Sequence, residues 1–163
     1  MDGLTLTVTA KIEPVKGDRT QDNNSDPNGE YFSNNNSLVK ASDYKKIVAT
    51  VDVKNDTDKV MQIGPFYWSA QLQDGYSITP TVILGEQEDQ VQSHATGQYK
   101  LDYIVKSSIK AEKLKISYLW VKNQEEFNKI ITDPKLATMT EQEAKEKYGS
   151  VYTGIKLETD IQQ

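Results

Sequence analysis

The stretch YKKIVATVDVKNDTD, residues 44–58, decides the fold class of this chain. Apolar residues alternate in it with more polar ones, and this period of two predicts a strand with one buried face. The residues expected on that face are Ile47, Ala49, Val51 and Val53. The segment Asn55–Asp58 follows at once, and Asn and Asp side chains stabilise tight turns by bonding to nearby backbone. These four residues are therefore interpreted as turn residues and not as ligands.

Further strands are expected on both sides of this segment. The stretches with apolar alternation are residues 4–12, 60–63, 66–72, 76–84, 99–105 and 114–120. Asp74-Gly75 is a hairpin signal, and Pro80 favours an edge position for its strand. The last two stretches are expected to pair through a short polar turn. Strands at this spacing predict an all-β fold, an immunoglobulin-like antiparallel β-sandwich.

The remaining segments are expected to belong to one domain, residues 1–163, whose sandwich spans residues 4–121. Residues 18–37 hold six of the nine asparagines, and they carry too little apolar surface to order themselves, so a mobile loop is predicted. Two capping-box patterns begin at Asn123 and Thr140, and they predict one or two short helices. Residues 122–163 are interpreted as a helical extension and tail, with 151–161 as an edge strand or tail.

Composition narrows the class of partner. A net charge of −5 and a pI near 5.0 argue against nucleic acid, which requires a basic face. The chain has no cysteine, which excludes a disulfide framework and a thiol nucleophile. No apolar stretch of about 18 residues is present that could span a bilayer. Because the sequence opens almost directly on a strand, we expect the native N-terminus, and any lipid anchor, to lie upstream.

Two groups of residues are candidates for catalysis. His94 is the single histidine, and Ser93 cannot be its nucleophile because neighbouring side chains diverge; His94 is predicted to be a solvated loop residue. The acidic residues Glu86, Glu88 and Asp89 lie in one loop, whereas paired carboxylates act from separate elements across a cleft. These acidic residues are interpreted as solvent-exposed surface residues without a catalytic role. No catalytic residue, no cofactor and no enzymatic activity are predicted.

A calcium loop is the best candidate metal site in the sequence. Asn24, Asp26 and Asn28 alternate ahead of Gly29, as oxygen ligands do in such a loop. A charged first ligand is missing, and Asn35 stands where a bidentate glutamate is usual. A mobile loop without bound metal is therefore the preferred interpretation.

Aromatic residues offer a second kind of ligand site. Trp68 and Trp120 share their strand faces with aliphatic residues, so both are predicted to lie in the core. Tyr67, Tyr76 and Tyr152 are predicted to lie on the opposite face or near turns. A cluster of these three tyrosines would form a platform for a sugar, although core or rim packing is the commoner role of tyrosine.

Three features together resemble a known family. They are Val51-Asp52-Val53-Lys54-Asn55 with its turn, the Asp74-Gly75 hairpin, and a late strand entered through a linker that holds Gly97. Over residues 4–121 the chain resembles immunoglobulin-like domains of unknown function in Gram-positive secreted lipoproteins, which are related in fold to a mycobacterial secreted immunogenic protein. The Asn-rich insertion and the helical extension depart from that pattern. The family has no assigned catalytic residues, so the resemblance implies none here.

These observations predict a non-catalytic interaction module, extracellular or anchored at the cell surface, that binds a protein or a component of the cell envelope. The alternative is a carbohydrate- or cell-wall-binding module that uses the exposed tyrosines. An enzyme that uses the acidic loop is a third hypothesis, and it would require Glu86 or Asp89 to face another carboxylate.

Overall fold

The computed structural model describes residues 3–16, 40–63, 68–78, 80, 82–85 and 90–163. The strands in this part of the chain are β1 Leu4–Pro14, β2 Tyr44–Asn55, β3 Met61–Gln62, β4 Trp68–Leu72, β5 Ser77–Ile78, β6 Val82–Gly85, β7 Gln90–Val91, β8 Thr96–Lys106, β9 Lys113–Val121 and β10 Tyr152–Gln162. The α-helices are α1 Gln124–Ile130 and α2 Glu141–Tyr148, and both lie between β9 and β10. Short 3-10 turns cover Ala41–Asp43 and Leu136–Thr138. The predicted all-β class with short C-terminal helices is confirmed.

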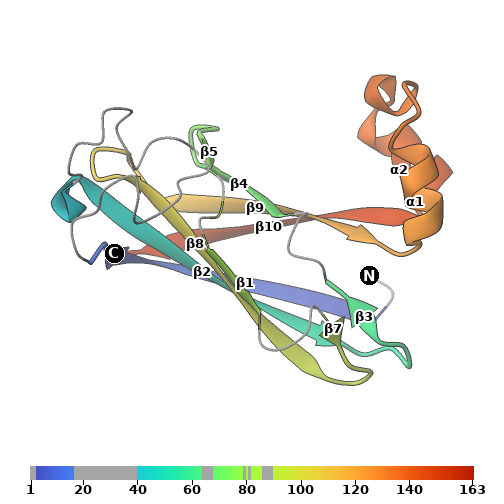
Figure 1. The fold of residues 1–163 in the computed structure, drawn as a ribbon, viewed down its shortest axis with the longest axis horizontal. Helices are drawn as coiled ribbons and strands as arrows, with labels where there is room; N and C mark the ends of the chain where they lie inside the picture. Colours follow the sequence, from blue (N-terminus) through green and yellow to red (C-terminus); the bar gives the residue numbers. More distant parts are fainter. Residues whose placement is uncertain (1–2, 17–39, 64–67, 79, 81, 86–89) are drawn as a thin grey trace.

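Among the described residues, eight strands form one curled sheet in the order β5-β4-β9-β10-β1-β2-β8-β6, and β3 pairs with β7 separately. The strands β1 and β10 are parallel and meet only at Ala10↔Ile161 and Lys11↔Gln162. This narrow junction divides the sheet into two layers, which approach each other near the C-terminus and separate towards α1 and α2 (Figure 1). The pairs within each layer are antiparallel. The β-sandwich prediction is confirmed, and one parallel pair joins its layers.

The core lies between the two layers. The four residues predicted to face inward from β2, Ile47, Ala49, Val51 and Val53, are all fully buried. Burying a valine or isoleucine side chain stabilises a fold by about 1.5–3 kcal/mol, so this strand contributes strongly to the core. Trp68 packs against Tyr118 with ring centroids 4.3 Å apart and ring planes tilted by 33°, and both tryptophans are buried. The prediction that Trp68 and Trp120 are core residues is confirmed.

The turn at Asp74-Gly75 forms the predicted hairpin between β4 and β5. Gly75 has a φ of +84°, a conformation that L-residues with a Cβ rarely adopt. The Asp74 carboxylate accepts a hydrogen bond from the Tyr76 amide at 3.1 Å. The strands β5 and β6 lie at opposite ends of the strand order, and Pro80 stands between them in the sequence. The predicted edge position is therefore confirmed, but Ser77–Ile78 and Val82–Gly85 are two strands in different layers and not one strand over residues 76–84.

Two expectations about strand pairing are wrong. The strands β8 and β9 do not form a hairpin, because β8 pairs with β2 and β6 while β9 pairs with β4 and β10. The polar link between them crosses from one layer to the other. Residues 152–162 form a central strand, β10, and not an edge strand or a tail. Its weak alternation misled the prediction, because polar Thr153 and Thr159 share the strand face of Ile155 and Ile161.

The helices begin where the capping patterns predicted. The side-chain oxygen of Asn123 accepts from the Glu126 amide at 3.2 Å, and Thr140 with Glu143 forms a complete capping box. Phe127 of α1 is buried and packs edge-on against Tyr152 with ring centroids 5.6 Å apart. None of the helices in the described part of the chain combines the length and apolar character needed to cross a membrane.

Candidate binding face

Several predicted site residues lie outside the described residues. They are the calcium candidates Asn24, Asp26 and Asn28, the tyrosine Tyr67, and the acidic residues Glu86, Glu88 and Asp89. The calcium loop and the acidic-loop site therefore stay predictions. Among the residues that the structure does describe, no group of three or more His, Cys, Asp or Glu side chains is placed to hold a metal ion.

The structure does not bring Tyr76 and Tyr152 together. Tyr76 is half-buried and packs against the core. Tyr152 is also half-buried, beside Phe127 and Tyr148. Its pKa is raised mainly by burial and to a smaller extent by the neighbouring Tyr148. Tyr152 pairs with Val121 of β9, whereas the hairpin that holds Tyr76 adjoins β9 near Lys115. Those two points on β9 are six residues, or about 20 Å, apart along the strand.

His94 is exposed, as predicted, and lies in the loop between β7 and β8. It adopts a positive φ of +56°, and its Nε2 lies 2.9 Å from a carboxylate oxygen of Asp58. The hydroxyl of Ser93 donates to the carbonyl of Thr57 at 2.7 Å and therefore not to His94. Sequence reasoning did not find Asp58 as the partner of His94, because only the register between β2 and β8 brings the two loops together.

Asn55 forms a buried polar cluster at this end of the sandwich, which we call the Asn55 junction (Asn55, Thr57, Lys59 and residues 91–95). The Asn55 amide nitrogen donates to the carbonyls of Lys59, Val91 and Gln92 at 2.7–3.1 Å. Its carbonyl oxygen accepts from the amide and the hydroxyl of Thr57. Asn55 is fully buried, although residues of its type are mostly exposed. The junction ties the β2 turn to the loop before β8, and this confirms the structural role predicted for Asn55.

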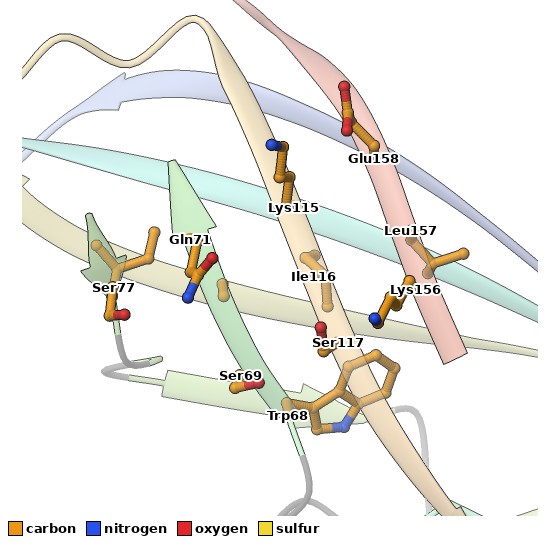
Figure 2. A pocket seen from close by; sticks show the side chains of 12 residues that line it. Trp68, Ser69, Gln71, Ser77, Lys115, Ile116, Ser117, Lys156, Leu157 and Glu158 are labelled. Carbon is orange, nitrogen blue, oxygen red and sulfur yellow. The ribbon is translucent and has the colours of Figure 1, made fainter. Parts of the chain in front are cut away.

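The outer face of the β5-β4-β9-β10 layer forms a hollow of about 770 Å³, which we call the trough. Strand register arranges its outward side chains in two rows. The first row is Ser77, Gln71, Lys115 and Glu158, and the second is Ser69, Ser117 and Lys156. Figure 2 looks onto this face, with the β9 side chains between those of β4 and β10. Residues far apart in the sequence thus share one polar surface.

The trough contains polar side chains that the fold itself does not use. Lys156 pairs with Glu141 of α2 at 2.6 Å, and Glu158 lies 3.4 Å from the ammonium of Lys113. Within the described part of the chain, five other side chains of the trough have neither a hydrogen-bond nor an ion-pair partner: Ser69, Gln71, Ser77, Lys115 and Ser117. These hydroxyl, amide and ammonium groups are free to contact a ligand.

The strand order of the described residues gives the class of fold, and comparisons with known proteins find only distant similarities. No family model matches the chain, and no curated protein is similar to it. An uncharacterised β-sandwich protein from Clostridium difficile 630 is 14% identical, with a TM-score of 0.44, over 72% of this chain and 80% of that one. A candidate lipoprotein of Bacillus subtilis subsp. subtilis str. 168 is 11% identical, with a TM-score of 0.44, over 98% of this chain and 39% of that one. The chain is a β-sandwich protein. These similarities carry no function over to it.

Sequence reasoning missed the trough for a physical reason. Ser69, Gln71, Lys115 and Ser117 stand at the outward positions of alternating strands, where polar residues are the rule. Nothing in the sequence distinguishes them from ordinary solvated side chains. Only the register that sets β9 between β4 and β10 brings them into one hollow.

Proposed function

We propose that this chain is a non-catalytic interaction module that is extracellular or anchored at the cell surface. It binds a protein or a component of the cell envelope on the trough. The observation that carries this proposal is the set of five polar side chains in the trough that have no partner within the described residues. Intramolecular contacts satisfy Asn55 at the other end of the sandwich, so the trough is the better candidate for an external ligand.

Binding explains these groups better than catalysis does. A serine nucleophile needs an adjacent base, which a third group orients. The trough serines Ser69, Ser77 and Ser117 make no side-chain hydrogen bond to any described residue. His94 has Asp58 as its partner, while the hydroxyl of its neighbour Ser93 donates to a backbone carbonyl. Neither the trough serines nor Ser93 has a hydroxyl that is activated in the way that acyl transfer requires.

We also propose that the sandwich is immunoglobulin-like, and its strand order supports this. In that fold one layer contains strands A, B, E and D, and the other contains C, F and G. Assigned in chain order, β1, β2, β8 and β6 correspond to A, B, E and D, while β4, β9 and β10 correspond to C, F and G. The trough then lies on the outer face of the C-F-G layer. The proposed location of the protein, extracellular or at the cell surface, rests on the family resemblance. Immunodetection in fractionated cells that express the native chain tests this location.

The tyrosine platform has less support as a ligand site. Tyr76 packs against the core and Tyr152 against Phe127, and they adjoin β9 at points about six residues apart. Tyr67 lies outside the described residues. A flat surface for sugar stacking would require all three rings on one exposed patch.

Two matched tryptophan substitutions test the proposal. Ser117→Trp fills the trough, and Thr50→Trp places the same bulk on the outer face of β2 in the other layer. Both positions are half-buried and lie in the middle of long strands. We expect the fluorescently labelled native chain and Thr50→Trp to bind a Gram-positive cell-envelope preparation that retains its surface proteins, and Ser117→Trp to bind at least tenfold less. Equal binding by the two variants, or no binding by the native chain, would contradict the proposal.

A further inference from the structure

We propose that the trough binds a neutral, hydroxyl-rich glycan chain through hydrogen bonds and without aromatic stacking. This inference rests on the proposed function and names the chemical class of the ligand at the same site. It places carbohydrate recognition on Ser69, Gln71, Ser77, Lys115 and Ser117 and not on the tyrosines.

The trough offers donors and acceptors in close alternation. A serine hydroxyl donates once and accepts twice, a glutamine amide does both, and a lysine ammonium donates three times. Gln71 lies between Ser77 and Lys115 across the strands, and Ser117 lies beside Ser69 in the next row. Sugar hydroxyls are likewise both donors and acceptors. A ligand with hydroxyls on neighbouring carbons therefore matches the pattern of the floor.

The same side chains are a poor match for a protein ligand. Protein interfaces gain most of their affinity from buried Trp, Tyr and Arg anchors, and the outward side chains of the trough include none of these types. Trp68 lies beneath it, but its ring is buried and packs against Tyr118 in the core. A peptide strand cannot add at β9, because β9 is already paired on both sides.

The dimensions of the floor suit a short length of chain. Four strands about 4.8 Å apart, with rows of outward side chains about 7 Å apart, give a floor of about 15 Å by 7 Å. The β4-β5 hairpin and α2 both rise from the side of the β9-β10 layer that faces away from β2 (Figure 1). The ion pair between Glu141 and Lys156 holds the start of α2 beside the second row. A glycan would cross the four strands, with α2 beside the second row.

Charge favours a neutral glycan over an acidic one. Lys115 has no ion-pair partner, but Glu158 stands directly across from it in the register of β9 and β10. Lys156 pairs with Glu141, and Lys113 pairs with Glu158 and Asp160. The positive and negative side chains around the trough therefore balance. A polyanion would meet carboxylates as often as ammonium groups.

Titration of the ¹⁵N-labelled chain with defined glycans tests the inference. The neutral probes are N-acetylglucosamine and glucose tetrasaccharides, and the acidic probe is a galacturonic acid tetrasaccharide. With a neutral probe we expect amide shifts at Ser69, Gln71 and Ser117, and no change in affinity between low and high salt. Gln71→Leu keeps the size of the side chain and should weaken binding about tenfold, since it removes both donors and the acceptor. Thr50→Val, on the other layer, should leave the affinity unchanged.

Each outcome decides between two readings of the trough. Binding of the acidic probe alone, lost at high salt and in Lys115→Gln, would overturn the neutral-glycan inference in favour of an anion site. If no glycan shifts the trough amides while Ser117→Trp still abolishes envelope binding, the ligand is not a glycan and the proposed function stands. If Ser117→Trp binds the envelope preparation as Thr50→Trp does, the proposed function fails as well.

Discussion

The Asn55 junction and the trough are two polar regions of one sandwich with opposite properties. Asn55 is fully buried, and both atoms of its amide group make hydrogen bonds within the chain. The trough residues Gln71 and Lys115 are exposed, and their side chains contact no described partner. The polar groups of the junction hold loops together, whereas those of the trough are left available.

Structural and functional polar residues respond differently to substitution. Removing one member of a satisfied buried network leaves its partners unpaired, which costs stability. Removing an exposed side chain without partners costs little stability, and any large effect must then come from a ligand. Substitutions in the two regions should therefore affect different measurements.

The largest effect on stability is expected from Asn55→Ala. The carbonyls of Lys59, Val91 and Gln92 would lose their donor inside the protein, which should cost about 3 kcal/mol. Urea unfolding measures the loss. Asn128→Ala is the matched control, because that asparagine is exposed on α1 and should change stability by less than about 0.5 kcal/mol. A similar loss in the free energy of unfolding in the two variants would show that the hydrogen bonds of Asn55 do not stabilise the fold.

A third kind of polar group, buried but unsatisfied, sharpens the comparison. Tyr103 is fully buried, and its hydroxyl has no hydrogen-bond partner among the described residues. Burial raises its pKa, so it stays protonated. Tyr103→Phe should stabilise the fold by about 1 kcal/mol, since an unsatisfied buried hydroxyl is unfavourable. Thermal unfolding measures this, and a loss of stability would mean that the hydroxyl has a partner.

Acid should loosen α2 before it affects the junction. The amide and hydroxyl of Thr140 hydrogen-bond the Glu143 carboxylate and lower its pKa below 4.5. Because the pKa of Glu143 is lower in the folded state, its carboxylate stabilises the helix start at pH values above the unfolded-state pKa. This contribution is lost as the pH falls through the folded-state pKa. As the pH falls from 6 to 3, we expect the amides of α2 to lose protection from hydrogen exchange, measured relative to the intrinsic exchange rate at each pH. Glu143→Gln keeps a capping side chain, so an equal acid response in that variant would contradict the account.

The smallest effect on stability is expected in the trough. Ser69→Ala and Ser117→Ala remove exposed or half-buried hydroxyls that have no partner among the described residues, so each should change the free energy of unfolding by less than about 0.5 kcal/mol. The same two substitutions should weaken binding of the neutral glycan probe. Urea unfolding and the glycan titration, run on the same samples, check both halves. A stability loss above about 1 kcal/mol would place these serines in the same class as Asn55.

The sequence predicted those parts of the fold that depend on local pattern. The alternation of β2, the Asp74-Gly75 turn and the two helix caps follow from a few adjacent residues, and the structure confirms them. Pairing across long separations could not be predicted. β10 carries weak alternation, yet it lies at the centre of the sheet because β9 and β1 flank it. The trough depends on the same pairing, so it could not be found from the sequence either.

The most direct test of the central claim uses the junction as an internal control. The ¹⁵N-labelled chain is titrated with soluble fragments of a Gram-positive cell wall, and the backbone amides of Gln71, Lys115 and Ser117 are compared with the side-chain amide of Asn55. We expect the three trough signals to shift in a saturable way while the Asn55 signals stay in place. Shifts confined to Asn55 and its neighbours, with silent trough amides, would contradict the assignment of the trough as the binding face.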